Sequence, residues 1–169
     1  MPMPLRIFLP VTVALFVTAF AALRGAENGP CVFCEIAAGR TPQASTVVYA
    51  DDQVVAFMDR APRNPGHVLV VPKAHARDIL DVPPATLSRV AEVAQKIPKA
   101  IKRTDVKAEG FNVTSNTGSA AGQDMFHLHF HVIPRFGGEA PSSPGERRPI
   151  KSPAEHAEVA SKIRDALKK

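Results

Sequence analysis

The chain has 169 residues and a mass of 18.1 kDa, with 45% hydrophobic residues, 22% charged residues and a mean hydropathy of -0.04. This length and composition fit one globular domain and exclude disordered, collagen-like and polytopic membrane proteins. The 21 basic and 16 acidic residues give a formal charge of +5, which favours anionic ligands without distinguishing nucleic acid, phosphate esters and a membrane surface.

The N-terminal segment is typical of a targeting sequence. Arg6 precedes a run without charged residues over positions 7–23, and Ala19-Phe20-Ala21 supplies an A-x-A cleavage pattern. We therefore predict a signal peptide over residues 1–21, a linker over 22–30 and a periplasmic or secreted protein. An uncleaved anchor in the inner membrane is the alternative, and contact with a membrane is expected only in that case.

Hydrophobic periodicity predicts a mixture of helices and strands in the middle of the chain. A short helix is expected over residues 32–38, and a long helix should begin near Pro83 or Pro84. Pro98 lies inside the apolar stripe of the long helix and predicts a kink or an early end. Strands are expected over five segments: 46–50, 54–58, 67–71, 111–115 and 128–133. This order suits an α+β domain with a mainly antiparallel sheet.

The C-terminal part divides into a loop and a helix. Residues 137–151 are rich in Pro, Gly and Ser, which predicts an irregular surface loop. Ser152 and Glu155 form a capping box, and apolar residues follow at helical spacing, so a helix over 152–169 should pack on the domain. Residues 31–136 remain as the folded domain that carries the chemistry.

Histidine alternates with large apolar residues over positions 127–133. On a strand the apolar residues would face the core, while His127, His129 and His131 would line the opposite face. Three interpretations are open: a polar sheet face, a metal site with histidine ligands, and a nucleophilic histidine supported by its neighbours.

The loop before these histidines bears on the choice. Residues 116–124 contain Gly, Asn, Ser and Gln, whose backbone and side-chain groups can donate hydrogen bonds to an anion. Such a loop alone is usually only a turn. Next to a row of imidazoles it favours phosphoryl or nucleotidyl chemistry over a bare metal site.

These motifs resemble the histidine triad (HIT) family. The pattern His-φ-His-φ-His-φ-φ is matched at every position from 127 to 133, and similar motifs occur at 31–36, 56–59, 65–73 and 116–123. The resemblance implies an α+β fold with a five-stranded antiparallel sheet, two main helices and a C-terminal helix, usually as a homodimer that binds a purine nucleotide. It also implies cleavage of a nucleoside monophosphate from a phosphoramidate or dinucleoside polyphosphate through a nucleotidyl-histidine intermediate.

The resemblance assigns roles to individual residues. His129 would be the nucleophile, His131 would help to protonate the leaving group, and His67 would complete a proton relay. The implied nucleotide contacts are Asn116, Gly122 and Gln123 at the phosphate, Asp59 at the ribose, and Phe33 and Phe57 at the base. For the two phenylalanines, packing in the core is an equal alternative. Asp124 stands where many family members have Ser or Thr, so its carboxylate would either turn away from the phosphate or orient a histidine.

Cys31 and Cys34 form a Cys-x-x-Cys pair and are the only cysteines. In an exported protein such a pair would by default form a disulfide, whereas two thiolates with two further ligands would bind zinc. The sequence resembles a subset of bacterial HIT proteins and the galactose-1-phosphate uridylyltransferases, in which two histidines complete the site. Their positions match His75 and His127. The resemblance thus implies a structural zinc, and the chemistry itself would need no cofactor.

Other functions remain open at this point. The main alternative is a non-catalytic exported protein that binds a nucleotide or zinc. Another is a zinc hydrolase that uses the three triad histidines as ligands. Nucleic-acid binding has the least support, because the chain has one Tyr and lacks basic stripes interleaved with aromatic residues.

Overall fold

The computed structural model describes residues 30–139 and 152–169. The predicted signal peptide, the linker up to residue 29 and residues 140–151 of the predicted loop lie outside these ranges. The described elements, in chain order, are α1 (Val32–Ala37), η1 (Pro42–Thr46), β1 (Val47–Ala50), β2 (Val54–Met58), β3 (Val68–Pro72), α2 (Pro84–Ile101), β4 (Gly110–Thr114), η2 (Ser119–Ala121), β5 (Phe130–Arg135) and α3 (Pro153–Leu167). Within those two ranges, none of the helices has both the length and the apolar character needed to cross a membrane.

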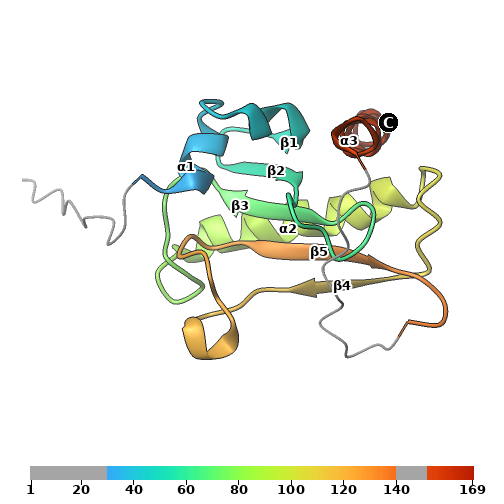
Figure 1. The fold of residues 1–169 in the computed structure, drawn as a ribbon. Coiled ribbons are helices and arrows are strands. Elements are labelled where there is room, and N and C mark those ends of the chain that lie inside the picture. The colour runs from blue at the N-terminus through green and yellow to red at the C-terminus, as the bar shows by residue number, and fades with distance from the viewer. Residues whose placement is uncertain (1–29, 140–151) are drawn as a thin grey trace, which may run out of the picture.

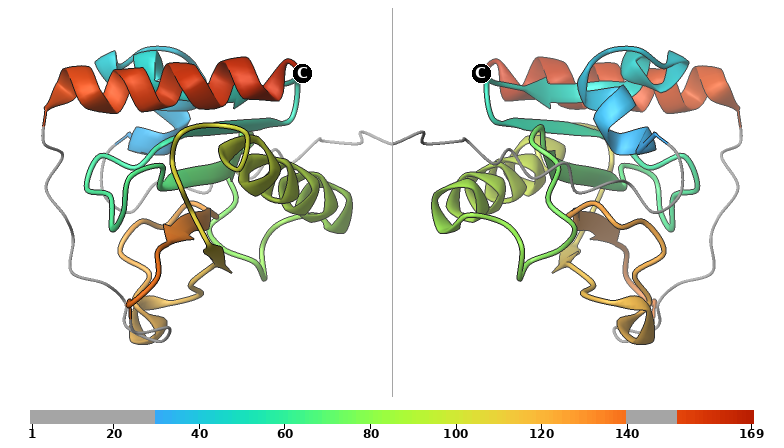
Figure 2. Two further views of the ribbon diagram at one scale, coloured as in Figure 1. Left: turned by 90° about the vertical axis from the view of Figure 1, so that its right-hand side faces the viewer. Right: turned by 90° about the vertical axis from the view of Figure 1, so that its left-hand side faces the viewer.

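The five strands form one antiparallel sheet in the order β1-β2-β3-β5-β4 (Figure 1). The predicted α+β architecture is therefore confirmed. Figure 2 shows α1 and α2 on opposite sides of this sheet, with α3 running across the β1 end. The sheet thus has helices on both faces, which explains why β2 and β3 are buried at every position.

Alternation along the strands separates two hydrophobic clusters. Val54, Ala56 and Met58 of β2 belong to the large core under α2 and α3. Val55 and Phe57 point to the other face, where they pack with residues of α1. His131 pairs with Leu69 across β3 and β5, and Leu69 belongs to the second cluster. The α1 face of the sheet therefore carries the histidine of β5.

Helix α2 differs from the sequence prediction at Pro98. The helix does not end there but continues to Ile101. Proline removes one backbone hydrogen bond and crowds the preceding turn, which disfavours a helix interior. Ile97, Ala100 and Ile101 are all buried in the large core, and their packing offsets this cost over the last turn. The predicted early end is wrong because tertiary burial outweighs the local preference.

The predicted terminal helix is present as α3 and is anchored at several points. The side chain of Ser152 accepts a hydrogen bond from the backbone N–H of Glu155 (3.1 Å), which caps its first turn. Arg164 donates to the carbonyl of Val47 (3.0 Å) on the edge strand β1, and Arg103 donates to the carbonyl of Ala166 (2.6 Å). These contacts cover one edge of the sheet.

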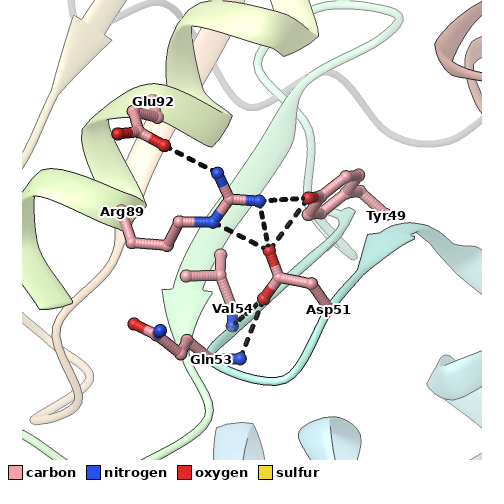
Figure 3. Close-up of polar contacts among 6 residues, drawn as sticks. All are labelled: Tyr49, Asp51, Gln53, Val54, Arg89 and Glu92. Atoms are coloured by element: carbon pink, nitrogen blue, oxygen red, sulfur yellow. Dashed lines mark hydrogen bonds and ion pairs between the residues drawn. The ribbon is translucent and has the colours of Figure 1, made fainter.

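A polar network joins the turn between β1 and β2 to α2 (Figure 3). Asp51 accepts hydrogen bonds from the backbone N–H groups of Gln53 and Val54, both at 2.8 Å, and from Tyr49 (2.9 Å). Arg89 of α2 donates to the same carboxylate at 2.6 and 2.9 Å. Partial burial raises the pKa of Asp51, but these hydrogen bonds outweigh it and hold that pKa well below its ordinary value.

Replacing Asp51 with asparagine is therefore expected to lower the free energy of unfolding at pH 7 by about 1–3 kcal/mol. Because the folded state depresses the pKa of Asp51, its contribution is present above an ordinary carboxyl pKa of about 3.9 and is lost as the pH falls below it. Urea unfolding at pH 7 and pH 3 measures this difference, with the exposed neighbour Asp52→Asn as the matched control. Equal losses for both variants would contradict the assignment.

Candidate active site

His67 and His131 meet where β3 and β5 pair. Val68 is the first residue of β3 and pairs with Val132, so His67 lies just outside β3 and beside this ladder. Its side chain is only 1% exposed. The Nε2 atom of His67 lies 3.0 Å from Nδ1 of His131. The structure thus brings together two of the three predicted catalytic histidines in a direct hydrogen bond.

The neighbouring groups define the direction of that hydrogen bond. The backbone N–H of Arg63 donates to Nδ1 of His67 (3.2 Å), so the proton of a neutral His67 is on Nε2. His67 then donates to Nδ1 of His131, and a neutral His131 carries its own proton on Nε2. Burial, followed by repulsion from His129, lowers the pKa of His131 to about 4. His131 is therefore neutral at pH 7, and its Nε2–H is the end of the hydrogen-bonded pair.

His129 has the opposite tautomer, with its proton on Nδ1. Its Nδ1 atom lies 2.7 Å from the backbone carbonyl of His127, to which it donates. Its Nε2 atom is therefore the one that carries the lone pair, as a nucleophile requires. The rings of His129 and His131 are 4.8 Å apart between centroids. The Nε2 lone pair of His129 and the Nε2–H of His131 thus belong to adjacent rings.

The triad is not one continuous strand, in contrast to the sequence prediction. Strand β5 begins at Phe130, and its pairing with β4 ends at Thr114 and His131. The next residue, Ser115, donates from its side-chain hydroxyl to the carbonyl of His129 (2.9 Å). A side chain replaces the ladder at this point because β4 has ended. Ser115 was not identified from the sequence, although a hydroxyl residue between a strand and the predicted anion loop is the available signal.

Asp59 lies beside the relay. Its Oδ2 atom is 3.4 Å from Nδ1 of His67, and its Oδ1 accepts from the backbone N–H of Ala61 (2.8 Å). The predicted ribose acceptor is thus also a neighbour of the proton relay. Asp124 is exposed, and its negative charge raises the pKa of His131, in opposition to the larger effect of burial. The charge of Asp124 therefore acts on His131 electrostatically.

The loop between β4 and β5 is tied together by its own amide side chains. Gln123 is 3% exposed; its Oε1 accepts from the N–H of Gly118 (2.8 Å), and its Nε2 donates to the carbonyls of Arg77 (2.8 Å) and Met125 (3.1 Å). Both of its N–H donors are used, so Gln123 supports the loop and has none left for a phosphate in this structure. Asn116 donates to the carbonyl of Gly122 (3.2 Å), which has a φ of 83°.

The two phenylalanines lie on the α1 side of the sheet and pack edge to face, with 5.4 Å between ring centroids. Phe57 is 0% exposed, so it has no ring surface to offer a base. In this structure Phe57 belongs to the second hydrophobic cluster, which corresponds to the alternative of core packing. Phe33 packs edge to face against His129, with 5.4 Å between ring centroids, and supports that ring.

A second cluster joins α1 to the triad. The Nδ1 atom of His127 lies 3.3 Å from Sγ of Cys31 and 3.5 Å from Sγ of Cys34, and Nδ1 of His75 lies 3.5 Å from Sγ of Cys34. The four donor atoms all lie within 4.8 Å of one another. Zn–S and Zn–N bonds of about 2.3 and 2.0 Å make the S···N edge of a tetrahedron about 3.5 Å. The four residues therefore fit a tetrahedral zinc site.

The surroundings of the cluster also suit a metal. Burial lowers the pKa of His127 to about 4, which keeps the imidazole neutral, and its Nε2 donates to the carbonyl of Pro72 (2.9 Å). Burial and the neighbouring Cys31 raise the pKa of Cys34 to about 11, so its thiol is protonated at pH 7. Two thiolates side by side would therefore require a bound cation. Since His127 also accepts from His129, one residue links the candidate metal site to the candidate nucleophile.

The chain is similar to known proteins over this same region. A model of the HIT domain matches residues 40–138. An uncharacterised HIT-like protein of Methanocaldococcus jannaschii is 40% identical over 109 residues, which cover 64% of this chain and 81% of that protein. An adenylylsulfatase of Arabidopsis thaliana is 41% identical over 108 residues, or 62% of this chain and 52% of that enzyme. The crystal structure of a zinc-bound histidine triad family protein from Mycobacterium smegmatis aligns with a TM-score of 0.71 and 36% identity, over 82% of this chain and 93% of that one.

Proposed function

The chain belongs to the histidine triad (HIT) family, and we propose that it is a nucleotidyl hydrolase or transferase. Its substrate would be a phosphoramidate or dinucleoside polyphosphate, from which it removes a nucleoside monophosphate. The observation that carries this proposal is the fixed tautomer of His129, whose Nδ1 is held by the His127 carbonyl at 2.7 Å. A buried imidazole held in this way keeps its lone pair on Nε2, through which it can form a bond.

The first half of the proposed reaction forms a phosphorus–nitrogen bond. Nε2 of His129 attacks the α-phosphorus, and the bond to the leaving group breaks with its electron pair. The Nε2 proton of His131 passes to the leaving group, while His67 donates across the 3.0 Å hydrogen bond to Nδ1 of His131. The negative charge left on this histidine pair balances the positive charge of the nucleotidylated His129 ring. This transfer leaves the nucleotidyl group on His129 and the leaving group neutralised.

The second half returns the enzyme to its starting state. Water attacks the phosphorus of the nucleotidyl-histidine, its proton returns along His131 and His67, and the P–N bond breaks to free Nε2 of His129. A second nucleophile in place of water would give transfer instead of hydrolysis. In both cases the charge on the phosphate would meet the positive-φ glycine loop, whose backbone N–H groups can approach an anion closely.

For the nucleotide, we propose Asn116 and the amides near Gly122 at the phosphate, Asp59 at the ribose and Phe33 at the edge of the base site. Phe33 is nearly buried, which limits its contact with a purine to the ring edge. For zinc, we propose a structural ion held by the four residues of the Cys31/Cys34 cluster, where it would cross-link α1 to the residues before β5. The zinc-bound relative supports this assignment.

A homodimer is supported by an edge of the sheet that no other strand of residues 30–139 and 152–169 pairs with. Strand β4 is at the edge, and Val113 on it is 47% exposed. An apolar groove of about 380 Å³ lies between this strand and α2 and is lined by Val113, Phe130, Ala94 and Pro98, among others. A second copy related by a two-fold axis would cover both features. Sedimentation velocity of the wild type should show a dimer that Val113→Glu dissociates, whereas Ile79→Glu, at an equally apolar exposed site, should leave it intact.

Export of the protein stays a proposal based on the leader-like residues 1–21 alone. It would place the Cys31–Cys34 pair in an oxidising compartment, where a bound zinc ion would protect the thiolates from disulfide formation.

Trapping the covalent intermediate tests the proposed function. The protein is mixed with adenosine 5′-phosphoramidate or a dinucleoside polyphosphate, quenched within seconds and digested for mass spectrometry. We expect a nucleotidyl group on the peptide that contains His129. Tight AMP binding without any adduct or turnover would instead identify a nucleotide-binding protein that lacks catalysis.

A further inference from the structure

His67 is the last residue of a tight turn, which places it beside His131. The N–H of His67 donates to the carbonyl of Asn64 (3.1 Å), which closes a four-residue turn through Pro65 and Gly66. Gly66 has a φ of 82°. Proline at the second position and a positive-φ glycine at the third define a type II turn. The placement of His67 therefore depends on how this turn is held against the rest of the domain.

The side chain of Asn64 holds the turn against the strand that carries His131. Asn64 is 2% exposed, and its Nδ2 donates to the carbonyl of Pro134 on β5 at 2.8 Å. Pro134 lies three residues after His131 on the same strand. Gly66 rests on the same residue, since a Cβ added there would lie 3.2 Å from Cγ of Pro134. His131 lies on β5, and the turn that carries His67 packs against Pro134 of the same strand. Both partners of the His67–His131 hydrogen bond are thus positioned by one short stretch of β5.

The second proton of Asn64 is used as well. Nδ2 also donates to Oε2 of Glu139 at 3.0 Å, and this oxygen is 3.0 Å from Nε of Arg135. The two acceptors facing Asn64 are a carbonyl and a carboxylate, so the site requires a group that only donates. An aspartate there would place two carboxylates together in a largely buried position, which is unfavourable.

We propose that Asn64 is a positioning residue, which holds His67 at hydrogen-bond distance from His131 and so sets the proton relay. This inference rests on the proposed function for its catalytic consequence. The backbone ladder between β3 and β5 begins only at Val68. On the β2 side the carbonyl of His67 accepts from the N–H of Asp59 (3.0 Å), which holds the backbone of His67 but does not fix its side chain. Asn64 does not touch the reacting atoms and acts through His67.

The test compares Asn64→Ala and Asn64→Asp with the wild type. A displacement of His67 by a fraction of an ångström should lower kcat by roughly tenfold to a hundredfold while KM changes less than about twofold. Nitrogen-15 shifts of the histidine side chains should show the Nε2–H tautomer of His67 in the wild type and mixed tautomers in the variants. Adding Glu139→Gln to Asn64→Asp should recover part of kcat, because it removes the carboxylate repulsion.

Tyr49→Phe is the control, because it weakens the polar network of Figure 3, which contains none of the relay residues. It should lower the melting temperature with kcat unchanged. Wild-type kcat and tautomers in both Asn64 variants would overturn the proposal, and so would a rise in KM alone or a kcat loss that Tyr49→Phe reproduces. If the wild type forms no nucleotidyl adduct, the proposed function fails, while the tautomer measurement still decides the role of Asn64.

Discussion

Replacing His129 with alanine is expected to lower kcat by a factor of about 10⁴ to 10⁶ and to abolish the covalent adduct. The structure gives the reason: His129 is the triad histidine whose Nδ1 is bonded to a backbone carbonyl and whose Nε2 is left as the lone-pair nitrogen. No neighbouring group can replace it, since His131 uses its Nδ1 to accept from His67 and carries a proton on Nε2. Single-turnover kinetics with an adenosine phosphoramidate, followed by adduct mapping, measures both effects.

The matched control for that experiment is His156→Ala. His156 lies on α3 and belongs neither to the triad and its partner His67 nor to the Cys31/Cys34 cluster. It should leave kcat within about twofold of the wild type, because it contributes no atom to the relay or to the nucleophile. A His129→Ala variant that keeps more than a tenth of wild-type kcat would show that bond formation takes place elsewhere.

The second large effect concerns the metal cluster. Cys31→Ser together with Cys34→Ser is expected to reduce bound zinc from about one ion per chain to almost none and to lower the melting temperature by more than about 10 °C. A structural zinc ion contributes its binding free energy to the folded state, and loss of a few kcal/mol shifts the midpoint by several degrees for each kcal/mol. Metal analysis and calorimetry of the purified protein measure the two quantities.

A structural zinc and a disulfide make opposite predictions for the thiols. With zinc, denaturation in the presence of a chelator should release two reactive thiols per chain, whereas a disulfide would release none without a reductant. A zinc hydrolase that uses the triad histidines as ligands is distinguished by how fast activity is lost after zinc is chelated. If zinc is structural, activity should decline with the unfolding signal after chelation, and an immediate loss of activity in a folded protein would contradict that role.

Local chemistry was sufficient to predict much of the fold. The strand over residues 54–58 and the cap at Ser152 both follow from short-range preferences that the tertiary structure does not oppose. Pro98 is the exception, because its local cost is set against the burial of three residues in the last turn of α2. Burial depends on what packs against the helix, and the sequence of the helix does not contain that information.

For the site, the sequence determined which residue types were available and their spacing: a row of histidines, a glycine-containing loop and a Cys-x-x-Cys pair. Only the tertiary structure decided which of these side chains are buried and which groups they bond. It buried Phe57 and used up the donors of Gln123, although both had been expected at the nucleotide. Hydrogen bonds that span long distances in sequence, such as that from Asn64 to Pro134, connect elements through space. Which tautomer each histidine adopts depends on such partners, and so the chemistry of the triad became defined only when the chain had folded.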